Sequence, residues 1–154
     1  VTPGSLIYGV HQPMILDLTS LQSAISALER SVVVFQMAAA DPAASVYWET
    51  LRAGVIQHFE FTYELCWKFM QRWLEEERGS ATVVGLPRRE LFRVAAEERL
   101  ISDVVPWFDY ARARNQTVHT YNQEVAEDVL GVSLRFVVDA NAFGKELARR
   151  NAQR

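Results

Sequence analysis

A segment with several reactive groups lies at residues 112–122, which read RARNQTVHTYN. Arg114 can clamp and neutralise phosphate oxygens, and His119 can move a proton near neutral pH. Asn115 can orient a hydroxyl or a phosphate, and Tyr121 adds a phenol two residues after the histidine. These groups are suited to handling a phosphodiester. That chemistry needs no metal ion and no cofactor, so we expect none.

The same segment also has a purely structural interpretation. Arg114 could pair with a carboxylate, His119 could bond a backbone carbonyl, and Tyr121 could pack at a helix end. The residue types alone leave both interpretations open.

Helical geometry restricts how these groups can meet. At 100° per residue, Asn115 and His119 lie about 40° apart on a helix, whereas Arg114 and His119 lie about 140° apart. Either Arg114 reaches around, or the helix ends before His119, or Arg114 of one copy works with His119 of another. Cleavage of RNA by its 2′-hydroxyl benefits from one base and one acid. Because the motif supplies one histidine, a twofold dimer would complete the pair.

Other familiar sites are absent from the sequence, which contains no glycine-rich phosphate loop, no pair of CxxC motifs, no HExxH and no GxSxG. Most enzyme classes are thereby excluded. His11 lies in an irregular N-terminal segment, and His58 follows an apolar position in mid-helix, where a structural or surface role is expected. The single cysteine, Cys66, cannot form an internal disulfide and is interpreted as a core thiol in a reducing, cytoplasmic compartment.

Apolar periodicity predicts an all-α fold, an antiparallel up-and-down bundle of about five helices with one long central helix. Residues 80–86 are predicted to form a loop, and no convincing strand pattern is present. The long helix spans about 50 Å, and its aromatic residues Phe61 and Trp67 lie off the main apolar stripe, which suggests a partner helix or subunit. The expected helices cover about 17–40, 45–78, 87–100, 106–118 and 123–150.

A single domain is expected for a chain of 154 residues, of which 49% are hydrophobic. We assign residues 14–154 to it and interpret residues 1–13 as a leader or an expression remnant that is poorly ordered. No apolar run reaches the roughly 18 residues of a membrane helix, so a soluble protein without membrane contact is predicted. The net charge is −3, and any contact with nucleic acid must therefore be local.

Two stretches together carry a family resemblance. Residues 59–68 read FEFTYELCWK, and they are followed by Arg114-Asn115 and by His119-Thr120-Tyr121. In this order and spacing they resemble the nucleotidyltransferase substrate-binding protein family of the HEPN superfamily, over about residues 18–147. The resemblance implies a helical bundle, usually a homodimer, that is encoded beside a minimal nucleotidyltransferase and binds it.

The resemblance also implies roles for the motif. In related HEPN proteins the arginine and histidine form a metal-independent ribonuclease site at the dimer interface, and the protein is the toxin of a toxin-antitoxin pair. The nucleotidyltransferase is then the antitoxin and transfers AMP to the motif tyrosine. Carried over, Arg114 and His119 would be catalytic, Asn115 supportive and Tyr121 the AMP acceptor.

Three functions remain open at this point. The intact set of Arg114, His119 and Tyr121 favours a ribonuclease toxin. The acidic net charge, without a broad basic surface, favours a non-catalytic subunit that presents a nucleotide or substrate to the transferase. A scaffold with a vestigial motif is the third. The sequence does not identify the RNA or the nucleotide.

Overall fold

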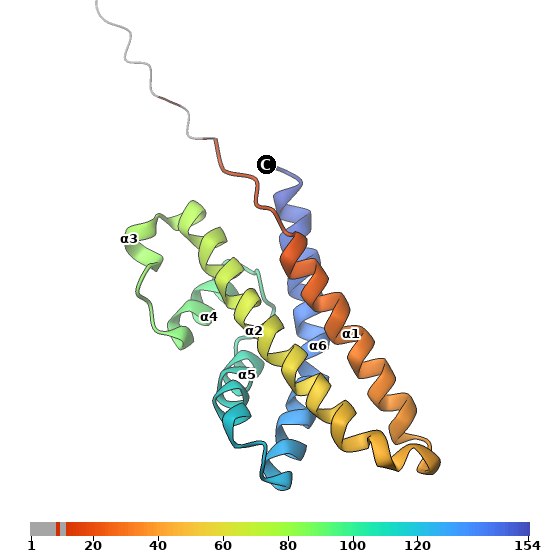
Figure 1. Ribbon diagram of the computed structural model, residues 1–154. Helices are drawn as coiled ribbons and strands as arrows, with labels where there is room; N and C mark the ends of the chain where they lie inside the picture. Colours follow the sequence, from red (N-terminus) through yellow and green to blue (C-terminus); the bar gives the residue numbers. More distant parts are fainter. Residues whose placement is uncertain (1–8, 10–11) are drawn as a thin grey trace, which may run out of the picture.

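The computed structural model describes Gly9 and residues 12–154. The prediction for residues 1–13 and the interpretation of His11 therefore fall almost entirely outside the described residues. Within the described part all regular structure is helical, which confirms the predicted all-α bundle (Figure 1). The elements are α1 (Thr19–Ala39), η1 (Pro42–Tyr47), α2 (Trp48–Arg78), α3 (Ser80–Val83), α4 (Arg88–Glu97), α5 (Val105–Gln116), η2 (Thr117–His119) and α6 (Gln123–Asn151).

Three long helices, α1, α2 and α6, form the body of the bundle, and the shorter α5 packs against α6 and α2. In Figure 1, α1 descends from the end that holds the C-terminus, α2 rises beside it, α5 descends, and α6 rises back to that end. The apolar residues of α1 that recur every three or four positions are buried, as the periodicity predicts. Gly144 of α6 allows α1 to approach closely, because a Cβ there would lie 2.7 Å from Cδ1 of Ile25. Neither glycine of α6 interrupts that helix.

The long helix α2 has 31 residues and ends at Gly79, whose φ of 88° favours glycine. It begins at Trp48, slightly later than predicted, because Asp41 and Pro42 first start a 3-10 turn in which Asp41 Oδ1 accepts from the Ala43 N–H at 3.0 Å. Cys66 is fully buried within α2, and burial raises the pKa of its thiol. The interpretation as a core thiol is confirmed.

Two connections differ from the predictions. Residues 80–86 are not wholly a loop, because Ser80–Val83 form one helical turn that buries Val83. The helix predicted to reach about Val118 ends at Gln116, and the chain continues as the 3-10 turn η2. No helix among the described residues is both long and apolar enough to cross a membrane.

An aromatic cluster fixes α5 against α2 and α6. The ring of Phe136 on α6 makes edge contacts with Phe59 of α2 at 5.1 Å and Tyr110 of α5 at 5.0 Å between centroids. Trp107 of α5 also meets Phe136, at 5.7 Å. The Tyr110 hydroxyl donates to Asp139 of α6. These contacts set the direction of α5 and so place its C-terminal end beside α2.

Candidate active site at the end of α5

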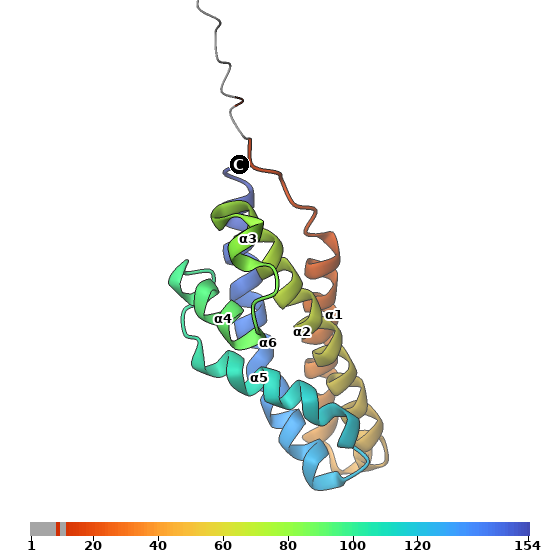
Figure 2. The same ribbon diagram turned by 90° about the vertical axis from the view of Figure 1, so that its left-hand side faces the viewer.

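The motif occupies the last turn of α5 and the tight turn that leads into α6, at the lower right of Figure 2. Thr117 is buried there. Its Oγ1 donates to the Arg114 carbonyl at 2.8 Å and accepts from Arg114 Nη1 at 3.0 Å. Thr120 Oγ1 donates to the Thr117 carbonyl at 3.1 Å, and Asn122 caps α6 by accepting from the Glu124 N–H at 2.9 Å. The turn therefore holds its own shape through local hydrogen bonds.

Arg114 points back onto α2 and pairs with two carboxylates there. Its Nε lies 3.3 Å from Glu64 Oε1, and its Nη1 lies 3.7 Å from Glu60 Oε2. The contact at Nε is an ion pair without hydrogen-bond alignment. Nη2 has no partner among the described residues, and 31% of the side chain is exposed. The prediction that Arg114 pairs with a carboxylate is thus correct. The edge of the guanidinium that carries Nη2 remains available to a phosphate.

His119 and Tyr121 project into solvent. Their ring centroids are 6.1 Å apart with planes at 78°, and Tyr121 is 85% exposed. Within the described part of the chain the His119 imidazole makes no hydrogen bond to a carbonyl, and the Tyr121 ring meets no aromatic ring other than that of His119. Both groups are accessible to a second molecule.

The geometry answers one of the questions left open by the sequence. The α-helix ends at Gln116, before His119, as one of the three alternatives supposed, and the chain continues through His119 as the 3-10 turn η2. Asn115 is exposed on the last turn of α5, and its side chain forms no hydrogen bond with another described residue. The structure therefore places Asn115, Arg114 and His119 on one short segment, with Arg114 fixed and the other two free.

Sequence reasoning missed Glu60 and Glu64 as partners of the motif. They stand one helical turn apart in the FEFTYELCWK run, so they share a face of α2. That spacing marks a shared carboxylate face of α2, but it does not identify Arg114 as the partner of that face. Glu64 is itself held in place, because Trp67 Nε1 donates to Glu64 Oε2 at 2.9 Å.

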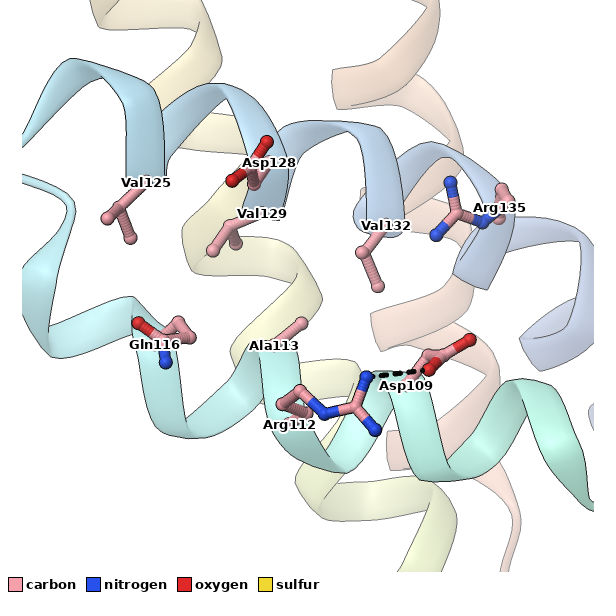
Figure 3. A pocket seen from close by; sticks show the side chains of 9 residues that line it. All are labelled: Asp109, Arg112, Ala113, Gln116, Val125, Asp128, Val129, Val132 and Arg135. Atoms are coloured by element: carbon pink, nitrogen blue, oxygen red, sulfur yellow. Dashed lines mark hydrogen bonds and ion pairs between the residues drawn. The ribbon is translucent and has the colours of Figure 1, made fainter.

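A groove of about 450 Å³ lies between α5 and α6, and Ala113 and Gln116 in its lining are sequence neighbours of Arg114 and Asn115 (Figure 3). Val125, Val129 and Val132 of α6 point into it, and Arg112 at its rim pairs with Asp109 at 3.1 Å. None of the four motif residues that we predicted lines it. Among the described residues, no group of three or more His, Cys, Asp or Glu side chains is arranged to hold a metal ion.

A protein-family model described as "nucleotidyltransferase substrate binding protein like" matches residues 16–149. The chain belongs to this family. The matched range includes both the 59–68 run and the motif, so the resemblance seen in the sequence is confirmed.

The chain is also similar to a named protein and to a solved structure, both from Haemophilus influenzae. The chain is 35% identical over 138 residues to a protein of Haemophilus influenzae named probable ribonuclease HepT, with 88% of this chain and 94% of the relative covered. A solved structure from Haemophilus influenzae, described as the fold of a substrate-binding domain of a nucleotidyltransferase, superposes with a TM-score of 0.78 at 32% identity. That match covers 86% of this chain and 99% of the other.

Proposed function

We propose that this protein is the HEPN-type partner of a minimal nucleotidyltransferase in a cytoplasmic toxin-antitoxin pair, and that it is a metal-independent ribonuclease. The observation that carries the proposal is that Arg114, held by ion pairs to α2 with part of its side chain exposed, and the exposed His119 imidazole lie five residues apart, at the end of α5 and on η2. The similarity to a probable ribonuclease supports it. In the pair, Tyr121 accepts AMP from the nucleotidyltransferase.

The proposed reaction is attack of an RNA 2′-hydroxyl on the neighbouring phosphate. One His119 takes the proton from the 2′-hydroxyl, and His119 of a second copy gives a proton to the departing 5′-oxygen. Arg114 neutralises the charge that develops on the phosphate oxygens, while Asn115 orients the hydroxyl or the phosphate. The products are a 2′,3′-cyclic phosphate and a 5′-hydroxyl end.

The direct test is incubation of the purified protein with RNA in the presence of a metal chelator. We expect cleavage with cyclic phosphate ends, and loss of that cleavage after treatment with the neighbouring nucleotidyltransferase, ATP and magnesium. If the protein binds the nucleotidyltransferase but cleaves no RNA, the proposed ribonuclease function is wrong, and the non-catalytic binding subunit is favoured.

We further propose that the protein is a homodimer that buries the exposed face of α2 beside the motif. Phe61 on this face is 57% exposed, although large aromatic residues are usually buried. It lies within one turn of Glu60 and Glu64, the two residues that hold Arg114. Burying Phe61 between two copies would bring the two motifs together, as the proposed acid and base require.

Phe61→Asp is expected to convert the dimer to a monomer and to remove RNA cleavage, because a carboxylate would have to be desolvated in the interface. Analytical ultracentrifugation at micromolar concentration measures the first effect. Val138→Asp is the matched control, since Val138 on α6 is 67% exposed and lies outside this face. If the wild-type protein sediments as a monomer, two copies do not share a site, and the proposal that two His119 side chains act as acid and base is wrong.

One observation favours the alternative, a non-catalytic nucleotide-binding subunit. The groove between α5 and α6 has an apolar floor, and Arg112, Gln116 and Arg135 line it (Figure 3). Its volume of about 450 Å³ lies within the usual range of ligand sites. Under this alternative, calorimetry with ATP or AMP would detect binding that Arg135→Ala weakens and His119→Ala leaves unchanged.

A further inference from the structure

Two arginines at the start of α4 are stacked on aromatic rings of other helices. The Arg88 guanidinium lies 3.3 Å from the ring centroid of Trp67 on α2, and that of Arg89 lies 4.1 Å from the ring centroid of Phe108 on α5. We call these four residues the arginine shelf. Figure 2 shows α4 and α5, the two helices that carry Arg88, Arg89 and Phe108, one above the other beside the long helices.

The charges of the shelf are not neutralised by carboxylates. Neither Arg88 nor Arg89 forms an ion pair with another described residue, whereas Arg112, Arg149 and Arg150 each pair with an acidic side chain on their own helix. Stacking occupies the flat face of a guanidinium and leaves the N–H groups at its edges uncovered, and Arg88 directs part of its edge toward the Tyr63 hydroxyl. Stacking also restricts the side chain before a ligand arrives, so less conformational entropy is lost on binding.

Further cations lie beside the same two rings. Lys68 Nζ is 5.6 Å from the Trp67 centroid, and the Arg93 guanidinium is 5.4 Å from the Phe108 centroid. Arg93 is paired with Glu90 and contributes less net charge. In a chain of net charge −3, this is the kind of local positive surface that contact with a polyanion requires.

A continuous line of contacts joins the shelf to the motif. Arg114 Nε lies 3.3 Å from Glu64, Glu64 accepts from Trp67 Nε1 at 2.9 Å, and Arg88 covers the Trp67 ring at 3.3 Å. Arg88 and Arg114 also act on the same phenol. Burial raises the pKa of Tyr63 to about 12, and the positive charges of both arginines oppose that rise. The shelf and the motif arginine therefore lie on one side of the bundle, within a few side chains of each other.

We propose that Arg88 and Arg89 bind phosphates of a single-stranded RNA next to the phosphate held by Arg114. The inference rests on the proposed ribonuclease function and names the rest of its substrate site. A single strand fits better than a duplex, because its unpaired bases can stack on guanidinium planes and aromatic rings while its flexible backbone follows the surface. The shelf supplies affinity and positions the strand, and it takes no part in proton transfer.

The test is binding of a fluorescent single-stranded RNA to His119→Ala protein, in which the RNA stays intact, by anisotropy over a series of salt concentrations. Adding Arg88→Ala and Arg89→Ala should weaken binding about tenfold or more. The slope of log affinity against log salt should fall in magnitude by about 1.4, because two phosphate contacts are lost at about 0.7 each. Arg88→Lys with Arg89→Lys should recover most of the slope and only part of the affinity, because lysine keeps the charge without the stacked fork.

The matched control is Arg30→Ala with Arg72→Ala in the same His119→Ala parent. It removes equal charge from exposed arginines that form no ion pair with described residues, and Arg72 also lies over an aromatic ring, that of Phe69 at 5.2 Å. If the Arg88→Ala, Arg89→Ala protein has the same RNA affinity and salt slope as this control, the proposed RNA contacts of the shelf are wrong. The proposed ribonuclease function is not affected by that result. A shelf variant that binds RNA normally but loses the nucleotidyltransferase would assign the surface to that protein instead. A His119→Ala parent that binds no RNA would overturn the ribonuclease and the shelf together.

Discussion

His119→Ala is expected to lower the rate of RNA cleavage by at least about a hundredfold while the helical content stays unchanged. The imidazole is the proposed proton-transfer group, and such groups contribute about 10²–10⁴-fold to rates. Its side chain is exposed and forms no hydrogen bond with another described residue, so its removal leaves no cavity and no unpaired buried group. Circular dichroism and thermal unfolding check the fold, and a cleavage assay checks the rate.

Arg114→Ala should reduce cleavage to a similar extent through loss of the phosphate contact. A small loss of stability, about 1 kcal/mol or less, is expected because the ion pairs with Glu60 and Glu64 are partly exposed. Arg112→Ala is the control, since Arg112 is two residues away on α5 and pairs with Asp109 at 3.1 Å on the groove side. If Arg114→Ala and His119→Ala both cleave like the wild type, the motif is structural and the binding subunit is favoured.

The helices were predictable because their signals are local. Apolar residues at helical spacing, Asp17, whose Oδ1 accepts from the Thr19 N–H at 3.0 Å, Pro106 in the first turn of α5 and Gly79 after α2 each act within a few positions of the element that they define. The one-turn helix α3 has no such signal. It exists because Val83 can be buried against the remaining fold, which only the tertiary structure decides.

The contacts of the site were harder to predict, because they join distant parts of the chain. The sequence identified Arg114 and His119 and, separately, the FEFTYELCWK run, but no local pattern connects Glu64 with an arginine 50 positions later. The same limit applies to Phe61 and Trp67, whose positions off the main apolar stripe predicted contact with a partner helix or subunit. Trp67 finds its partners, Glu64 and Arg88, within the chain, whereas Phe61 remains exposed.

The second large effect is expected at Tyr121. Of the tyrosines in the described residues, Tyr63 and Tyr110 are buried at 3% and 1% exposure, so their hydroxyls are closed to a modifying enzyme. Tyr121 is accessible without any rearrangement, and its ring lies 6.1 Å from that of His119. AMP on its hydroxyl would place a phosphate and a bulky base beside the motif. The phosphate could pair with Arg114 and occupy the place of an RNA phosphate, so cleavage should stop by competition rather than by unfolding.

Incubation with the neighbouring nucleotidyltransferase, ATP and magnesium should therefore add one or more AMP units, and peptide mass spectrometry should locate them on Tyr121. Tyr121→Phe should remain folded, cleave RNA and resist neutralisation by modification. Tyr47→Phe is the control, because Tyr47 is also exposed, on η1, but lies outside the motif, and this variant should still be neutralised. Inhibition of Tyr121→Phe without ATP would reveal neutralisation by binding alone. An adduct elsewhere, or none while the transferase modifies another target, would refute Tyr121 as the acceptor and favour a subunit that presents substrate to the transferase.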